Sequence, residues 1–64
     1  MNARLTVHGK ECIAHVVDTA RTADLRYIDY RFAAGAVVSV DRNTNAAHLF
    51  GAGDVIALDK FELI

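Results

Sequence analysis

Short apolar runs alternate with polar residues along most of this chain, in the two-residue period of strands that bury one face. Glycines and an Asn-rich stretch separate these runs, at Gly9, Gly35, residues 43–45 and residues 51–53. The pattern predicts a single all-β domain over residues 1–64. We expect a small antiparallel meander of six to seven short strands, curled into a barrel or rolled sheet so that one face is buried.

The first hairpin is predicted from "VHGKECIAH", residues 7–15, with a two-residue turn at Gly9 and Lys10 that places Gly first, as a type II′ turn requires. Leu5 then pairs with Ala14, and Val7 pairs with Cys12. One face carries only apolar residues: Ala3, Leu5, Val7, Cys12, Ala14 and Val16. The opposite face carries Arg4, Thr6, His8, Glu11, Ile13, His15 and Val17. We therefore expect Cys12 to be a small buried hydrophobe.

The second hairpin is predicted around a three-residue loop at 33–35, where Gly35 supplies the left-handed position. This register pairs Phe32 with Ala36, Tyr30 with Val38 and Ile28 with Val40, so the core face is again apolar. The residues that fall on the opposite face are Tyr27, Asp29, Arg31, Val37, Ser39 and Asp41.

The chain then turns back through "RNTN", residues 42–45, whose Asn residues suit turn conformations. Pairing Asp41 with Ala46 places Ala47 and Leu49 on the core face, and His48 and Phe50 on the other. Two short strands split by a turn at 58–60 are expected in "DVIALDKFELI", residues 54–64; either Val55 and Ala57 or Ile56 and Leu58 face inward there. Residues 18–24, "DTARTAD", are expected to form a turn or at most one short helical turn.

Residues 36–64, "AVVSVDRNTNAAHLFGAGDVIALDKFELI", resemble the closing part of SH3-like and Sm-like small β-barrels. In those barrels a strand ends near an Asp, a tight loop follows, and a "VIALD"-type strand passes through one turn into a closing strand such as "FELI". The resemblance covers less than half of the chain and implies a barrel architecture. Sm-like barrels often bind RNA and assemble in rings.

Composition limits the classes of function. Hydrophobic residues make up 53% of the 64 residues and charged residues 23%, which is a high apolar content for so small a body and favours association with itself or a partner. The net charge of −1 lacks the basic excess of a nucleic-acid-binding surface. One cysteine allows no internal disulfide, and no signal segment or membrane-spanning run is found, so we expect a cytoplasmic protein without membrane contact.

The spacing H-x3-C-x2-H within residues 8–15 raises the possibility of a metal site. In the predicted register Cys12 lies on the face opposite His8 and His15, and the two histidines are roughly 13 Å apart at ~3.3 Å per residue, too far to share a zinc ion. Cys12 has no local histidine to act as a base, which leaves only the distant His48. We expect no metal, no cofactor and no catalytic residue, and a metal- or Cys-dependent enzyme is the least favoured reading.

The outer faces of the predicted hairpins are not fully polar. They carry Ile13, Val17, Tyr27, Val37 and Phe50 beside Arg4, Arg31, His15 and His48, a composition typical of protein interfaces. The alternative is that the sheet folds over and buries these residues in a two-layer barrel. The residues predicted to contact a partner are Tyr27, Arg31, Val37, His48 and Phe50.

These observations predict a small protein-binding module that acts by association. It would work as a homodimer, or as an inhibitor or accessory factor of a larger protein, a role common among small proteins of phages and mobile elements. A nucleic-acid-binding small barrel is the alternative function. That alternative needs the basic residues to gather on one face with Tyr27 or Phe50 available to stack on bases.

Overall fold

The computed structural model describes all 64 residues and contains seven strands and no helix. The strands are β1 (Asn2–Val7), β2 (Lys10–Arg21), β3 (Tyr27–Phe32), β4 (Val37–Asp41), β5 (Ala47–Gly51), β6 (Asp54–Ala57) and β7 (Lys60–Leu63). With no helix present, none is available to cross a membrane. The predicted all-β class and the antiparallel meander are confirmed.

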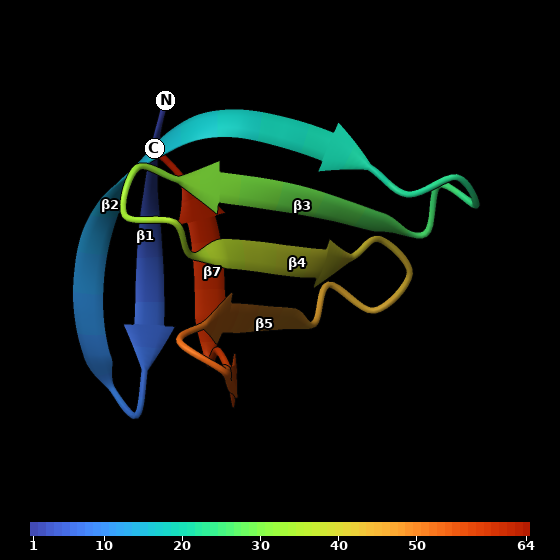
Figure 1. Cartoon of the computed structure of the whole chain (residues 1–64). Helices are drawn as coiled ribbons and strands as arrows, with labels where there is room; N and C mark the ends of the chain where they lie inside the picture. Colours follow the sequence, from blue (N-terminus) through green and yellow to red (C-terminus); the bar gives the residue numbers. More distant parts are fainter.

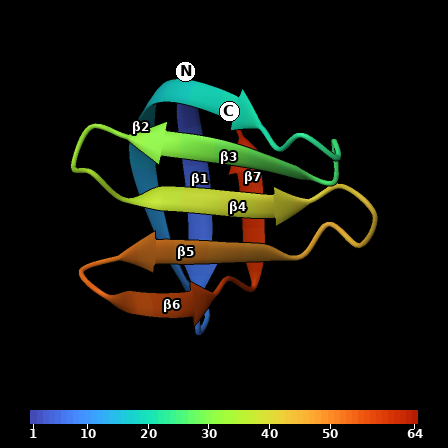
Figure 2. The ribbon, with the colours of Figure 1, turned by 45° about the vertical axis from the view of Figure 1, so that its right-hand side comes forward.

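The strands form one curled antiparallel sheet in the order β6-β5-β4-β3-β2-β1-β7. β2 is long and bent: its residues up to His15 pair with β1, those from Val16 onward pair with β3, and a β-bulge at Val17 lies just after this change of partner. Strands β3 to β6 therefore make one layer and cross in front of β1 and β7 (Figure 1, Figure 2). Since β6 and β7 do not pair with each other, the sheet is a half-barrel rather than a closed one.

The predicted register of β3, β4 and β5 is confirmed. Tyr30 pairs with Val38, and Val38 pairs with Leu49. The three-residue loop closes as expected, because the Phe32 N–H donates to the Ala36 carbonyl at 2.9 Å and Gly35 has a φ of 95°. Turn chemistry and alternation agree over this part of the chain, so each supports the other.

The predicted register of the first hairpin is wrong, because the two-residue turn lies one residue earlier in the chain than expected. The turn lies at His8 and Gly9, both with positive φ (50° and 78°), so Val7 pairs with Lys10 and Leu5 with Cys12. The Gly9 N–H donates to Asp59 Oδ2 at 3.0 Å, a contact with a residue 50 positions away that holds the turn in place. Because every partner shifts by two residues, the same side chains still share each face.

The turn or helical turn expected at residues 18–24 is confirmed only at its end: β2 continues through Arg21, and a turn follows at residues 22–25, where the Leu25 N–H donates to the Thr22 carbonyl at 2.9 Å. Thr19 and Ala20 pair with β3, which satisfies their backbone groups more completely than a single helical turn could. The connection to β3 is a loop at 22–26. In it Asp24 Oδ1 accepts hydrogen bonds from the Thr22 hydroxyl at 2.6 Å and the Arg26 N–H at 3.0 Å.

The core lies between the two layers and is small. Six hydrophobic residues are buried: Ala3, Leu5, Val16, Phe32, Val38 and Ala47. Tyr30 and Phe61 close one side of it with ring centroids 5.0 Å apart. Cys12, which was expected to be buried, is exposed. Cys12 lies near the hairpin turn, in residues 10–15, which pair with β1 but have no strand on their other edge, because β3 pairs with β2 only from Val16 onward.

Candidate functional site

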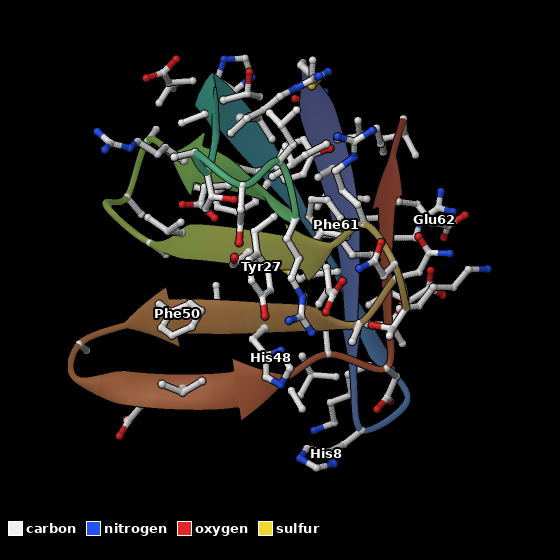
Figure 3. The ribbon with its side chains drawn as sticks, turned by 90° about the vertical axis from the view of Figure 1, so that its right-hand side faces the viewer. His8, Tyr27, His48, Phe50, Phe61 and Glu62 are labelled. Atoms are coloured by element: carbon white, nitrogen blue, oxygen red, sulfur yellow. The ribbon has the colours of Figure 1, made fainter.

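The outer face of strands β3 to β6 is covered by no other element. The register places two rows of side chains side by side on this face. One row is Arg31, Val37, Phe50 and Val55, and the other is Asp29, Ser39, His48 and Ala57. Tyr27 lies at the end of the same face, and Figure 3 shows Tyr27, His48 and Phe50 together on the side of the sheet that is turned to the viewer.

These rows enclose an open depression of about 440 Å³. Its lining residues are Thr22, Tyr27, Asp29, Ser39, His48, Phe50 and Val55. Three of them are apolar or aromatic, and Asp29 is the only carboxylate among them. We call this set of seven residues the outer-face depression. Its mixture of aromatic, apolar and hydrogen-bonding groups is typical of the compositions found at protein interfaces.

Comparison with protein-family models, curated proteins and solved structures finds no match to this chain. What the depression can bind is therefore inferred from its own residues and geometry.

Of the five predicted contact residues, Tyr27, His48 and Phe50 line the depression. Arg31 and Val37 lie on the same face, in the row that ends at Phe50 and Val55, but do not line it. All five thus share the face predicted for them.

Four lining residues were not chosen from the sequence. Asp29 and Ser39 were placed on the correct face, but nothing in the sequence indicated that a depression would form over them. Val55 belongs to a strand whose facing was left open. The register decides that question, because Val55 pairs with Phe50 on the outer face while Ile56 pairs with Leu49 on the core face. Thr22 was missed because its segment was expected to be a turn or one helical turn and was given to no face of the sheet.

The alternative that the outer-face apolar residues are buried inside a two-layer barrel is wrong. Phe50 is 44% exposed and Val55 is 59% exposed. Ile13 and Val17 are exposed as well, at 53% and 56%, but they lie on β2, away from the depression. The outer apolar residues therefore form separate surfaces. A second, smaller hollow of about 300 Å³ lies at the bulge, lined by Met1, Val16, Val17, Asp18 and Thr19.

One end of the depression is bordered by a polar contact between two loops. Arg26 Nη2 donates to Asp41 Oδ2 at 3.1 Å, and the Arg42 N–H donates to the Arg26 carbonyl at 2.8 Å. The Arg26 guanidinium also lies over the Tyr27 ring, 5.3 Å from its centroid. These contacts hold Tyr27 at the rim of the depression.

Asp41 is the only buried charged residue, at 8% exposure. The Asn43 N–H, which donates to Asp41 Oδ1 at 2.9 Å, and the Arg26 guanidinium lower the pKa of this carboxyl below its ordinary value. The hydrogen bond to Asp41 in turn raises the pKa of Arg26. In the neighbouring loop the Thr22 hydroxyl and then the Arg26 N–H lower the pKa of Asp24. These charges are satisfied within the fold and stabilise its loops.

The residues that first suggested chemistry lie apart. No three His, Cys, Asp or Glu side chains gather in an arrangement that could hold a metal ion. His15 Nδ1 is 3.1 Å from Asn2 Oδ1, and the Cys12 thiol has only the Ile13 carbonyl within reach, at 3.8 Å. No histidine nitrogen lies within hydrogen-bond distance of the Cys12 thiol.

Proposed function

We propose that this chain is a small protein-binding module and that the outer-face depression is where it binds. The protein acts by association, as a homodimer, as an inhibitor or accessory factor of a larger protein, or as both. The observation that carries this proposal is the uncovered face of β3 to β6, where Tyr27, His48 and Phe50 line one depression and Phe50 remains 44% exposed. Aromatic side chains at the centre of an exposed patch are the usual anchors of protein interfaces.

The size of the core favours the same function. Only 7 of the 64 residues are buried, so burial of apolar side chains in its own interior contributes little to the stability of the chain. A partner that covers Phe50 and Val55 would remove further apolar surface from water, and binding to the folded state stabilises it by mass action. The open shape of the depression suits a protuberance of a protein surface better than a small molecule, which usually needs an enclosing cleft.

The charges at the depression argue against nucleic acid as the ligand. Asp29 lines the depression, and the Arg26 guanidinium at its rim is paired with Asp41. A surface for a phosphate backbone instead needs several unpaired cations close to its aromatic residues.

Affinity capture from cell lysate with three immobilised forms tests the proposal: the unsubstituted protein, the double variant Y27A/F50A, and the matched control I13A/L25A. The control removes two side chains that are 53% and 56% exposed and do not line the depression. We expect at least one protein to be captured by the unsubstituted chain and by the control, and lost with Y27A/F50A. Equal capture by all three folded forms would overturn the proposal. Circular dichroism of each form checks that the sheet is retained.

A further inference from the structure

The outer edge of β6 has backbone groups without a partner. The Leu58 N–H donates to the Ala47 carbonyl at 2.9 Å, and hydrogen bonding alternates along an antiparallel ladder. Ile56 and Asp54 therefore direct their backbone groups toward β5, as their pairing with Leu49 and Gly51 requires. Val55 and Ala57 direct their N–H and C=O groups away from the sheet. No strand lies on that side, because β6 is the last strand in the order and it lies at the lower margin of the sheet in Figure 2.

The half-barrel has two other free strand edges, and both carry charges that discourage pairing. The outer edge of β7 has Lys60 and Glu62, and Glu62 also pairs with Arg4 at 3.5 Å. The first half of β2 has Lys10, Glu11 and His15. Charged side chains are a common means of protecting edge strands from association.

β6 lacks this protection, because its only charge is Asp54 at its first position. It is also apolar on both faces: Val55 is 59% exposed on the outer face, and Ile56 is 39% exposed on the core face. An uncharged free edge between two exposed apolar side chains is a site where another strand can add to the sheet.

We propose that two copies of this chain pair through β6, antiparallel, about a two-fold axis that passes beside Ile56. In this register Val55 pairs with the partner's Ala57, and Ala57 with the partner's Val55. Each such pair exchanges two N–H···O=C bonds, so all four outward groups of each β6 strand are satisfied. If the two-fold axis passed beside Val55 or Ala57 instead, some of these outward N–H and C=O groups would have no partner.

The same register brings apolar side chains together and keeps like charges apart. Ile56 faces the partner's Ile56 across the axis in a non-hydrogen-bonded pair, where side chains approach most closely. The Asp54 carboxylates lie at opposite ends of the ladder, four rows apart. The ladder pairs three β6 residues of each chain, Val55 to Ala57, so we expect a weak dimer of the kind found below about 1,200 Å² of buried surface.

This inference rests on the proposed function and deepens it, because it says where a second copy attaches. Val55 lines the depression and would lie beside the partner's Ala57. The depressions of the two copies then lie on one continuous sheet face, on either side of the axis. The dimer would present two equivalent binding surfaces to a larger partner.

Sedimentation velocity at several concentrations tests the inference with four variants. A57P removes an outward N–H that β5 does not use, which an edge strand tolerates. I56K and I56E place like charges against each other at the axis, and I13K adds a charge to an exposed apolar residue elsewhere as the control. We expect a concentration-dependent dimer for the unsubstituted chain and for I13K. In A57P, I56K and I56E, dimerisation should weaken by at least about tenfold.

The decisive measurement is the mixture of I56K with I56E. If Ile56 faces the partner's Ile56, opposite charges meet in the mixed pair, and the mixture dimerises more strongly than either variant alone. A strict monomer in the unsubstituted chain, a species larger than a dimer, or a mixture that stays monomeric would overturn the inference. A dimer that is lost in Y27A/F50A but kept in I56K would overturn it too, while leaving the depression as the binding surface of the proposed function.

Discussion

Arg26 donates to a single oxygen of Asp41, Oδ2, from both Nε at 3.3 Å and Nη2 at 3.1 Å, and so ties the loop before β3 to the end of β4. Asp41 is 8% exposed and also accepts the Asn43 N–H. The Asp41 carboxylate therefore accepts hydrogen bonds from both the loop before β3 and the turn after β4, which lie at the same end of the sheet. Tyr27, under the Arg26 guanidinium, depends on this arrangement for its position at the rim of the depression.

Replacing Asp41 should make stability less dependent on pH. Since the folded state lowers the pKa of Asp41, its contribution is fully present above the ordinary value of 3.8 and is lost as the pH falls through the lower folded value. We expect D41N to be clearly less stable than the unsubstituted chain at pH 7, with the difference shrinking below pH 4. Urea unfolding at a series of pH values measures this, with the exposed Asp54 replaced by Asn as the control. A difference that stays constant down to pH 2 would contradict the assignment.

Truncation of two phenylalanines should change stability to very different extents. Phe32 is 6% exposed in the core, and F32A should cost about 3–5 kcal/mol, much of the free energy of unfolding available to so small a domain. Phe50 is 44% exposed, and F50A should change stability by about 0.5 kcal/mol or less. Urea denaturation followed by circular dichroism measures both. A large loss of stability in F50A would mean that the residue belongs to the core.

A loop glycine and a strand glycine should also differ in their response to substitution. Gly35 has a φ of 95°, so an added Cβ should cost about 1–2 kcal/mol through backbone strain. Gly51 lies in β5, where a Cβ would meet the Ala36 Cβ at 3.6 Å, an ordinary van der Waals contact. We expect G35A to lower the free energy of unfolding and G51A to leave it within about 1 kcal/mol of the original value. Equal losses in the two variants would show that the loop at 33–35 does not need its left-handed residue.

The thiol of Cys12 should react with a disulfide reagent in the native protein. It is exposed on the first half of β2, near the hairpin turn and at a free edge of the sheet. We expect one equivalent of thiol to react with DTNB without denaturant, at a rate similar to that in 6 M urea. Reaction only after unfolding would indicate that Cys12 is buried, as the sequence suggested.

Single-stranded RNA and DNA should not bind measurably, even at low salt. The rim cation Arg26 is already paired, and the net charge of the chain is −1. Fluorescence anisotropy with labelled oligonucleotides at increasing salt measures this. Binding that weakens steeply with salt would instead favour the nucleic-acid-binding alternative, because released counterions produce that dependence.

The part of the fold that could be predicted is the part where local signals agree. The register from Ile28 to Leu49 follows from Gly35, the turn at 42–45 and strict alternation, and all of these act within a few residues of one another. The turn at His8 and Gly9 could not be predicted, since it is held by Asp59, 50 residues later in the chain. The extension of β2 to Arg21 depends on its pairing with β3, which overrides the polar character of "DTARTAD".

The candidate site was likewise predicted only as far as local signals reach. Alternation places Tyr27, His48 and Phe50 on one face without any knowledge of the fold. It does not reveal that Asp29 and Ser39 lie beneath an open depression, because that depends on the twist of neighbouring strands. The exposure of Cys12 was misjudged for a related reason: alternation assigns a residue to a face, but whether that face is covered depends on where distant strands begin and end.

The pairing of β7 with β1 has a consequence for the synthesis of this chain. Ala3 pairs with Leu63, and the Ile64 N–H donates to the Asn2 carbonyl at 2.9 Å, so of the seven strands of this sheet the first in sequence has the last in sequence as one of its two neighbours (Figure 1). While residues 60–63 are still inside the ribosome, β1 has an open side and Leu5 lacks Phe61. The hairpins of β3 to β5 can form as they emerge, but the layer built from β1, β7 and the start of β2 is completed only afterwards. The nascent chain therefore exposes its core face until synthesis of the sheet is nearly finished, and it is most prone to aggregation during that interval.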